Sequence, residues 1–151
     1  MADRMRRASP EEAGQLTELA LRSKASWGYD PVFMEACRDD LTVTREDIAD
    51  NPTYVVDGAG AVAGFYLLRP HGRAARLEFL YVAPEAMGKG YGRALFSHAV
   101  TQARDAGAVQ MTWDADPHAV PFYRKMGARQ EGWVPSSAVP GRLLPAMRCD
   151  F

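Results

Sequence analysis

Three glycines at alternate positions, Gly88, Gly90 and Gly92, separate two segments that differ in hydrophobic period. Before them, residues 75–82 alternate in the manner of a strand, and after them small and apolar residues recur at helical spacing as far as residue 106. A strand that turns through glycines into a helix leaves free backbone N–H groups and the positive end of the helix dipole at the turn. The segment therefore predicts a strand, loop and helix unit that can hold an anion.

The segments around this unit predict an α+β fold. Capping signals at Ser9, Asp30 and Thr44 predict three helices in the first third of the chain. Residues 53–68 then read as a hairpin around a glycine-rich turn, and a break is expected at 69–72. The later segments predict a strand at 109–113, a helix at 117–126, and strands at 131–134 and 144–151. The expected sheet has about six to seven strands, is mostly antiparallel and is flanked by helices.

Composition excludes several classes of protein. The chain has 151 residues, 47% of them hydrophobic and 25% charged, which suits a single domain over residues 1–151. Its formal net charge of −1 gives no global attraction to nucleic acid, and its apolar runs are too short to cross a membrane. Because the first twenty residues lack the apolar core of a signal peptide, a cytoplasmic location is expected. Cys37 and Cys149 are too isolated to suggest a disulfide framework or a metal site.

Two common nucleotide loops do not match the glycines. A Walker A loop needs Gly-Lys followed by Ser or Thr, whereas Lys89 is followed by Gly90. A dinucleotide fingerprint needs a third glycine at the position that Arg93 occupies. Taken alone, the glycines are equally compatible with a tight turn before a helix.

Three segments together resemble the GNAT superfamily of N-acetyltransferases. Residues 87–92, MGKGYG, are similar to the family's Gln/Arg-x-x-Gly-x-Gly/Ala loop, and they follow a strand with the sequence LEFLYVAPE. Residues 116–127, DPHAVPFYRKMG, are similar to the family pattern Asn-x-x-Ala-x-x-Phe-Tyr-x-x-x-Gly at the expected distance. The order of the expected elements agrees with this family over nearly the whole chain.

The resemblance implies a GNAT-like sheet in which the strands at 77–82 and 109–113 splay apart. The slot between them would hold the pantetheine arm of acetyl-CoA, the expected acetyl donor, and no metal is required. The resemblance places the cofactor against the strand and loop residues Leu80, Tyr81, Val82, Met87, Gly88, Lys89, Gly90, Tyr91, Gly92 and Arg93, and against Asp116.

Two positions depart from the family pattern. Met87 replaces the usual Gln or Arg and removes a polar contact to the pyrophosphate, for which Lys89 or Arg93 could supply positive charge instead. Asp116 stands where Asn is common, and a carboxylate accepts hydrogen bonds but does not donate them. The main attraction for the pyrophosphate is expected from backbone N–H groups.

Glu78 is the candidate general base. An alkyl amine with a pKa of ~10.4 is mostly protonated at neutral pH and must lose a proton before it can attack a thioester. By the resemblance, Glu78 holds the position of a glutamate that acts directly or through water in many GNAT enzymes. The alternative is an ion pair with Arg76 or another arginine on a solvated sheet face.

Tyr123 is the candidate proton donor to the departing thiolate of coenzyme A, because a phenol keeps its proton at neutral pH. In this interpretation Phe122 packs in the core and Tyr123 points to the thioester, whose carbonyl the backbone N–H of Leu80 polarises. The alternative is that Phe122 and Tyr123 are both core aromatics. Transfer is expected to be direct, without an acyl-enzyme.

The acceptor is expected near Trp27 and Tyr29, which could form an aromatic wall or could anchor their loop to the core. Arg142, in the loop opposite, could pair with a substrate carboxylate. These residues predict an acetyl-CoA-dependent N-acetyltransferase for a primary amine of a small molecule. The alternatives are a protein or peptide N-acetyltransferase and a non-catalytic acyl-CoA-binding regulator. Homodimers are common in the family, and one is possible here.

Overall fold

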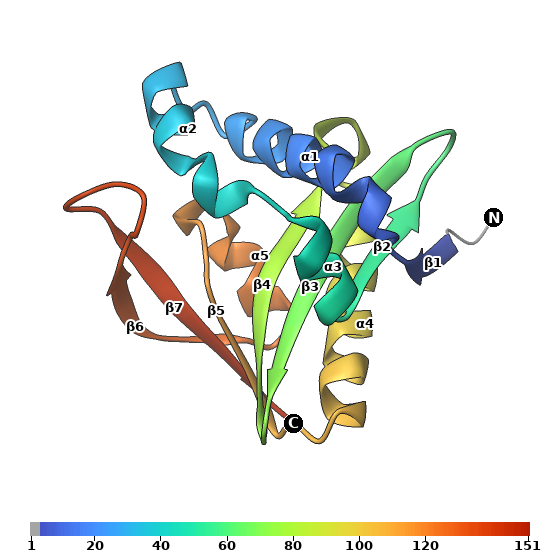
Figure 1. Ribbon diagram of the computed structural model, residues 1–151. Coiled ribbons are helices and arrows are strands. Elements are labelled where there is room, and N and C mark those ends of the chain that lie inside the picture. The colour runs from blue at the N-terminus through green and yellow to red at the C-terminus, as the bar shows by residue number, and fades with distance from the viewer. Residues whose placement is uncertain (1–3) are drawn as a thin grey trace.

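Alternating and helical segments of the sequence form one seven-stranded sheet with helices on both faces (Figure 1). The computed structural model describes residues 4–151. Short 3-10 turns at Pro10–Glu12, Asp39–Leu41, Pro84–Ala86 and Pro117–Ala119 connect some of the elements. The helices and strands follow in the order β1 (Arg4–Arg7), α1 (Ala13–Ala25), α2 (Pro31–Cys37), α3 (Arg45–Asp50), β2 (Thr53–Asp57), β3 (Val62–His71), β4 (Ala74–Val82), α4 (Tyr91–Asp105), β5 (Gln110–Asp114), α5 (Val120–Lys125), β6 (Arg129–Pro135) and β7 (Leu143–Asp150).

The sheet has the strand order β1-β2-β3-β4-β5-β7-β6, and β4 with β5 is its one parallel pair in the described chain. The mixed, mostly antiparallel sheet expected from the sequence is therefore confirmed. Helices α1, α2 and α3 cover one face and α4 and α5 the other (Figure 1). Because β3 lies between these layers, its residues 62–68 are all buried and form the centre of the core.

The capping residues expected from the sequence begin two of the helices. The Asp30 carboxylate accepts a hydrogen bond from the Phe33 backbone N–H at 2.8 Å at the start of α2. Thr44 and Asp47 form a reciprocal capping box at the start of α3, with both bonds at 3.0 Å. Such bonds pair backbone N–H groups that the helix itself leaves free.

Strands β4 and β5 separate soon after they meet. They pair only where Ala74–Arg76 faces Gln110–Thr112. Beyond this point β4 stays paired with β3, and β5 stays paired with β7. The two halves of the sheet therefore diverge and leave a V-shaped opening, visible between β4 and β5 in Figure 1. This is the splayed pair expected from the family resemblance.

The break expected at residues 69–72 begins later than predicted. Strand β3 continues through Pro70 to His71, and the turn lies at Gly72. Proline lacks the N–H that a central strand needs, yet Pro70 faces Ala75 of β4 in register. The pairing of β2 with β3 ends at Leu67, so a missing donor on that edge of β3 interrupts no ladder.

Candidate active site

Glu78 occupies an irregular position at the centre of β4. Leu67 of β3 faces Phe79, whereas the next residue, Leu68, faces Leu77, so Glu78 is the extra residue of a β-bulge. Bulges re-aim side chains and are common beside active sites. The strict alternation expected along β4 is interrupted here, and no local sequence signal marks the bulge.

The Glu78 carboxylate lies 3.5 Å from the guanidinium of Arg69, and both side chains are 39% exposed. Arg69 in turn contacts Asp47 of α3 at 3.0 Å, which places this group on the face of the sheet that α1 to α3 cover. Arg76 pairs with Asp114 at 2.7 Å, so the ion pair of Glu78 is with another arginine. Glu78 is thus oriented by an arginine and keeps open access to solvent.

The open edge of β4 carries unpaired backbone groups. Ala83 donates its N–H to the Ala63 carbonyl at 2.8 Å, toward the β3 side. Because backbone groups of successive strand residues point to opposite edges, the N–H groups of Leu80 and Val82 point toward the opening. No strand of the described chain pairs with that edge beyond Arg76. The opening therefore offers the row of donors and acceptors that an added strand would use.

The glycine loop bends tightly into α4. Gly88 and Gly90 have φ of +78° and +90°, in the left-handed region that favours glycine, and Gly90 is the N-cap of α4. The first helical bond runs from the Ala94 N–H to the Gly90 carbonyl at 3.1 Å, so the N–H groups before it have no carbonyl of the helix to bond. Gly92 lies against the Phe122 ring, which an added Cβ would approach to 3.2 Å. The loop thus brings backbone N–H groups to the opening without side chains in the way.

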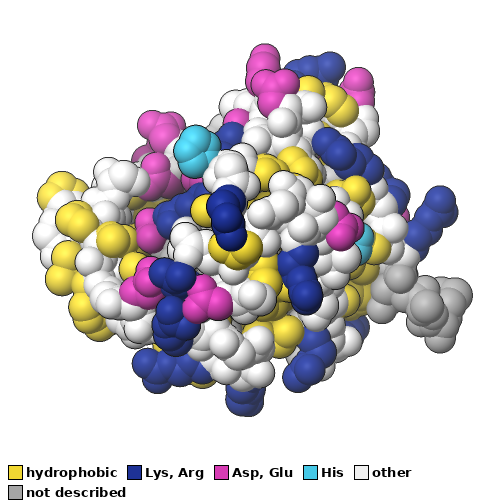
Figure 2. Space-filling view, turned by 90° about the horizontal axis from the view of Figure 1, so that it is seen from below, with side chains coloured by type: hydrophobic (Ala, Val, Ile, Leu, Met, Phe, Trp, Pro, Cys, Tyr) yellow, Lys and Arg dark blue, Asp and Glu magenta, His cyan; other side chains and the backbone are white. Residues whose placement is uncertain are grey.

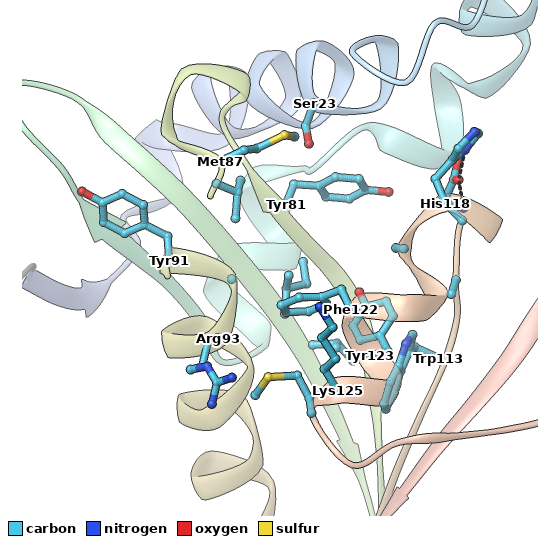
Figure 3. Close-up of a pocket in the computed structure, with 18 of the residues that line it drawn as sticks. Ser23, Tyr81, Met87, Tyr91, Arg93, Trp113, His118, Phe122, Tyr123 and Lys125 are labelled. Carbon is cyan, nitrogen blue, oxygen red and sulfur yellow. Dashed lines mark hydrogen bonds and ion pairs between the residues drawn. The ribbon is translucent and has the colours of Figure 1, made fainter. Parts of the chain in front are cut away.

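A pocket of about 650 Å³ fills the opening between β4, β5, α4 and α5. Figure 3 shows Arg93 and Lys125 on its α4 and α5 side, Ser23 and Met87 on the α1 side, and His118 at another end. The pocket is lined by most of the residues predicted from the sequence: Trp27, Glu78, Leu80, Tyr81, Val82, Met87, Gly88, Gly90, Tyr91, Gly92, Arg93, Asp116 and Tyr123. Three predicted residues, Lys89, Tyr29 and Arg142, are not among the described residues that line it.

Tyr123 is 7% exposed, and its ring packs against those of Trp113, Phe122 and Phe96 at centroid distances of 4.9, 5.1 and 6.0 Å. Burial, together with the negative charge of Asp116, raises the pKa of the Tyr123 phenol above its ordinary value. Its hydroxyl therefore keeps its proton at neutral pH. Phe122, expected in the core, is only half-buried and covers Gly92, so the deeper of the two rings is Tyr123.

Asp116 is the centre of a largely buried polar cluster. Its carboxylate accepts hydrogen bonds from Lys24 Nζ and the Tyr29 hydroxyl, each at 2.9 Å. It also accepts one from the His118 backbone N–H at 2.9 Å and lies 2.8 Å from His118 Nδ1. Burial would raise the pKa of this carboxyl, but the Lys24 ammonium and the donors outweigh it and hold the pKa well below its usual range. Asp116 is therefore ionised at neutral pH.

The rest of the cluster joins distant segments of the chain. Arg142 donates to the Tyr29 hydroxyl at 2.8 Å, and burial, followed by the bond to Asp116, raises the pKa of Tyr29 to about 12. Trp27 stacks on His118 with a centroid distance of 4.9 Å. Trp27, Asp116 and His118 thus line the pocket. Tyr29 and Arg142 hold Asp116 in place without lining the pocket themselves.

Sequence reasoning missed Lys24 and Trp113. Lys24 contacts Asp116 across 92 positions of sequence, and nothing in its local pattern distinguishes it from a solvated lysine on a helix. The sequence pattern marks Trp113 only as the end of a strand, whereas in the structure it lines the pocket. Only the folded arrangement reveals these contacts.

Residues 4–151 hold neither a membrane-spanning helix nor a cluster of metal ligands. None of the helices there combines the length and apolar character needed to cross a membrane. In the same part of the chain, no three or more His, Cys, Asp or Glu side chains are grouped so that they could hold a metal ion.

Comparison with known proteins identifies the family. A model of the acetyltransferase (GNAT) family matches residues 18–128, and the chain belongs to this family. Mycothiol acetyltransferase of Pseudarthrobacter chlorophenolicus is 33% identical over 121 residues, which are 72% of this chain and 37% of that protein. Streptothricin acetyltransferase of Streptomyces lavendulae is 36% identical over 110 residues, or 65% of this chain and 58% of that protein. The chain thus matches 37% and 58% of the lengths of these two relatives.

Solved structures confirm the fold. The crystal structure of PaiA N-acetyltransferase from Thermoplasma acidophilum, in complex with coenzyme A, superposes with a TM-score of 0.81 over 100% of both chains at 20% identity. A GCN5-related N-acetyltransferase from Rhodopseudomonas palustris gives a TM-score of 0.84 over 100% of this chain and 97% of that one at 22% identity. The seven-stranded sheet with its splayed pair is therefore the GNAT fold.

Proposed function

We propose that the chain is a single acetyltransferase domain over residues 1–151 that moves an acetyl group from acetyl-CoA directly to a primary amine of a small molecule. The observation that carries this proposal is the pocket between β4 and β5, which joins the glycine loop at one side to Glu78 and Tyr123. Membership of the GNAT family supports it.

The residues of the opening suit acetyl-CoA, which would supply the acetyl group as a thioester. The unpaired groups of Leu80 and Val82 match the amides of a pantetheine arm, which can add to a strand edge. Gly88 and the first turn of α4 present backbone N–H groups to a pyrophosphate. Arg93 and Lys125 line the same pocket and add positive charge, while Met87 contributes none. Neither the binding of acetyl-CoA by these residues nor the transfer of the acetyl group requires a metal.

Glu78 takes the proton from the acceptor ammonium, directly or through water. Glu78 is at the bulge and lines the pocket, and within residues 4–151 its carboxylate contacts one guanidinium group, at 3.5 Å. That contact leaves carboxylate lone pairs available for an amine. A positioned base typically contributes a rate factor of about 10² to 10⁴.

Tyr123 donates a hydrogen bond to the departing sulfur, along which its proton can pass. Its raised pKa keeps the donor protonated, and the packed rings around it fix its direction. The two cysteines, Cys37 and Cys149, are not among the described residues that line the pocket. This placement supports direct transfer over an acyl-cysteine.

The acceptor end of the pocket favours a cationic amine. The stacked rings of Trp27 and His118 form an aromatic surface there, and the Asp116 carboxylate beside them is already paired with Lys24. Arg142, which was expected to meet a substrate carboxylate, is bonded to Tyr29. Mycothiol acetyltransferase and streptothricin acetyltransferase, the two relatives, are both named for small molecules, which supports a small-molecule acceptor over a peptide.

Thiol release from acetyl-CoA tests the function across a panel of small amines, aminoglycosides and peptides. We expect turnover with a small cationic amine, an approximately 100-fold loss of kcat in Glu78→Gln and at least a 10-fold loss in Tyr123→Phe. Glu131→Gln and Tyr54→Phe, whose side chains lie outside the pocket, are matched controls and should stay within about 2-fold of the parent.

Other outcomes of this panel separate the alternatives. Turnover of peptides alone would favour a protein N-acetyltransferase, and tight acetyl-CoA binding without thiol release on any amine would favour a regulator. Full turnover in both pocket variants would reject the roles of Glu78 and Tyr123.

We also infer a homodimer through the β6 edge. β6 ends the described sheet and pairs only with β7 there, and Trp133 and Leu143 on this hairpin are 59% and 52% exposed. Figure 2 shows apolar side chains gathered at this end of the molecule. A second copy pairing along β6 would cover them. Sedimentation should show a dimer that Trp133→Glu converts to a monomer, and a parent protein that sediments as a monomer at all concentrations would reject it.

A cytoplasmic location is part of the proposal, because both cysteines are free thiols in the structure and acetyl-CoA would be the co-substrate. Fractionation of cells that express the tagged chain should recover it with cytoplasmic markers, and recovery in the membrane or secreted fraction would contradict this.

A further inference from the structure

Two hydroxyl groups of the pocket, those of Ser23 and Tyr81, form no hydrogen bond with any residue of the described chain. Ser23 is in α1 and only 4% exposed, and Tyr81 is in β4 and partly buried. A serine or threonine hydroxyl within a helix often bonds to the carbonyl one turn earlier, as Thr17 does to Ala13 at 2.9 Å. Within residues 4–151 Ser23 forms no such bond, so its hydroxyl, like that of Tyr81, is left for another partner.

Both hydroxyls are open to the pocket. In the part of the chain that the structure describes, Trp113 Nε1 is the one fully buried side-chain nitrogen or oxygen that lacks a hydrogen-bond partner. The oxygens of Ser23 and Tyr81 lack a partner as well, so they are not fully buried, and both residues line the pocket. Figure 3 shows the Ser23 oxygen turned from α1 toward the Tyr81 side of the pocket, and the Tyr81 ring extended toward His118.

The two hydroxyls belong to the end of the pocket that we propose for the acceptor. The Tyr81 ring points away from the glycine loop and toward His118 (Figure 3). Burial, followed by the nearby Tyr123 and Asp116, raises the pKa of the Tyr81 phenol above its ordinary value. The Tyr81 hydroxyl is therefore neutral at neutral pH, as the Ser23 hydroxyl is.

These surroundings favour a neutral oxygen on the ligand. A neutral hydroxyl can donate and accept, so it pairs with another hydroxyl or with an amide carbonyl. A ligand that placed only carbon there would displace water from both hydroxyls and leave them without a partner, which is unfavourable. A second carboxylate would be repelled, because the carboxylates of Glu78 and Asp116 line the same pocket.

We propose that Ser23 and Tyr81 are specificity-determining residues whose hydroxyls bond to a neutral oxygen of the acceptor, a hydroxyl or an amide carbonyl, a few bonds from its amino group. The proposal rests on the proposed function and narrows the acceptor to a primary amine that carries such an oxygen. It assigns the Tyr81 side chain to the acceptor, while Leu80 and Val82 on either side of it present backbone groups to acetyl-CoA.

Matched pairs of amines test the selection in the thiol-release assay. Ethanolamine and propylamine differ by a hydroxyl in place of a methyl group, and glycinamide and isobutylamine differ by an amide in place of a branched alkyl group. The parent should favour the oxygen-bearing member of at least one pair about 10-fold or more in kcat/KM. The first pair reports on a hydroxyl and the second on an amide carbonyl.

The decisive quantity is the change of this ratio in variants, because the oxygen also lowers the pKa of the amine and the amines are the same for every variant. Tyr81→Phe and Ser23→Ala should each lower the ratio about 5-fold. Tyr54→Phe and Ser97→Ala, outside the pocket, are matched controls and should leave it unchanged. Unchanged ratios in both pocket variants would overturn the proposal, as would equal losses on both members of each pair.

Two further measurements exclude other roles of the hydroxyls. The Kd for acetyl-CoA should be the same in the parent, Tyr81→Phe and Ser23→Ala, and a weaker Kd in both variants would assign the hydroxyls to the cofactor instead. Since neither hydroxyl has a partner in the described chain, Tm should stay within about 2 °C of the parent. A clear fall in Tm in both variants would show that the hydroxyls serve the fold.

The assay also separates this inference from the proposed function. If none of the four amines is turned over, the best acceptor of the wider panel decides: it should carry a hydroxyl or amide oxygen and lose at least 5-fold in kcat/KM in Tyr81→Phe. A best acceptor without oxygen would overturn the selection and leave the function standing. If the parent releases no thiol with any amine or peptide, the proposed function fails and this inference fails with it.

Discussion

At the scale of single residues, the Lys24 and Asp116 ion pair has the largest consequence. Their side chains are 11% and 12% exposed, so water hydrates neither charge well. Each charge is therefore stabilised mainly by the other. Removing one member of such a pair is much more costly than removing both, because a buried charge is left alone. The pair also connects α1 to the turn before α5, across the opening of the pocket.

Asp116→Asn should lower the free energy of unfolding by about 3 kcal/mol, as measured by urea denaturation at pH 7. The double variant with Lys24→Met should lose less than the sum of the two single variants. Asp105→Asn, at an exposed position, is the control and should stay within about 0.5 kcal/mol of the parent. Additive losses in the double variant would show that the two groups do not depend on each other.

The same pair predicts a pH dependence. The pKa of Asp116 is lower in the folded protein than in the unfolded chain, so its contribution to stability is full above the unfolded value of about 4 and declines as the pH falls below it. Above about pH 5 the Asp116 carboxyl is ionised in both the folded and the unfolded protein. The difference in unfolding free energy between the parent and Asp116→Asn should therefore be constant there and should shrink in acid. A difference that grows in acid would mean that folding raises the pKa of Asp116, which contradicts the prediction.

At the scale of elements, the close approach of α4 to β3 depends on Gly64. An added Cβ at this position would lie 2.8 Å from the Tyr81 carbonyl oxygen and 2.9 Å from Leu95 Cδ1. The first contact is with the backbone of β4, which cannot move without disturbing the open edge. The absence of a side chain at Gly64 therefore sets how α4 and the edge of the slot pack.

Gly64→Ala should cost about 1 to 3 kcal/mol of unfolding free energy through overpacking and should weaken acetyl-CoA binding as well. Gly132→Ala is a matched control in another strand, where an added Cβ has no atom within 4 Å. Thermal and urea unfolding of the two variants measures the difference. A Gly64→Ala protein as stable as Gly132→Ala would show that α4 adjusts freely.

Elements were easier to predict from the sequence than their junctions. The glycine loop, the helix after it and the caps at Asp30 and Thr44 follow from local patterns, because the residues that form each one are neighbours in the chain. The bulge at Glu78 and the cluster around Asp116 could not be found in this way. They depend on register and on contacts between residues far apart in sequence, such as Lys24 with Asp116 at a separation of 92 positions.

At the scale of the whole molecule, charge is balanced overall but uneven in the pocket. The chain has 18 Lys and Arg against 19 Asp and Glu, so it does not attract coenzyme A as a whole. Arg93 and Lys125 supply local positive charge, whereas Glu78, Asp114 and Asp116 supply carboxylates elsewhere in the lining. Binding of the phosphates should therefore depend on a few local groups.

Arg93→Gln and Lys125→Gln should each raise the Kd for acetyl-CoA about 5-fold at low salt and make it less sensitive to ionic strength. Arg129→Gln removes the same charge at a position that pairs with Asp150 outside the pocket, and it should leave the Kd unchanged. Calorimetric titration at several salt concentrations measures this. Equal effects of all three variants would mean that net charge, and not placement, controls binding.

Amide hydrogen exchange, measured with and without saturating acetyl-CoA, tests whether the arm of acetyl-CoA occupies the opening between β4 and β5. If the arm adds to the open edge of β4, the N–H groups of Leu80 and Val82, which no strand within residues 4–151 pairs there, should exchange markedly more slowly when acetyl-CoA is bound. The loop at 88–93 should become protected with them, while β1 and β2 stay unchanged. Unaltered exchange at Leu80 and Val82 in a protein saturated with acetyl-CoA would contradict the account.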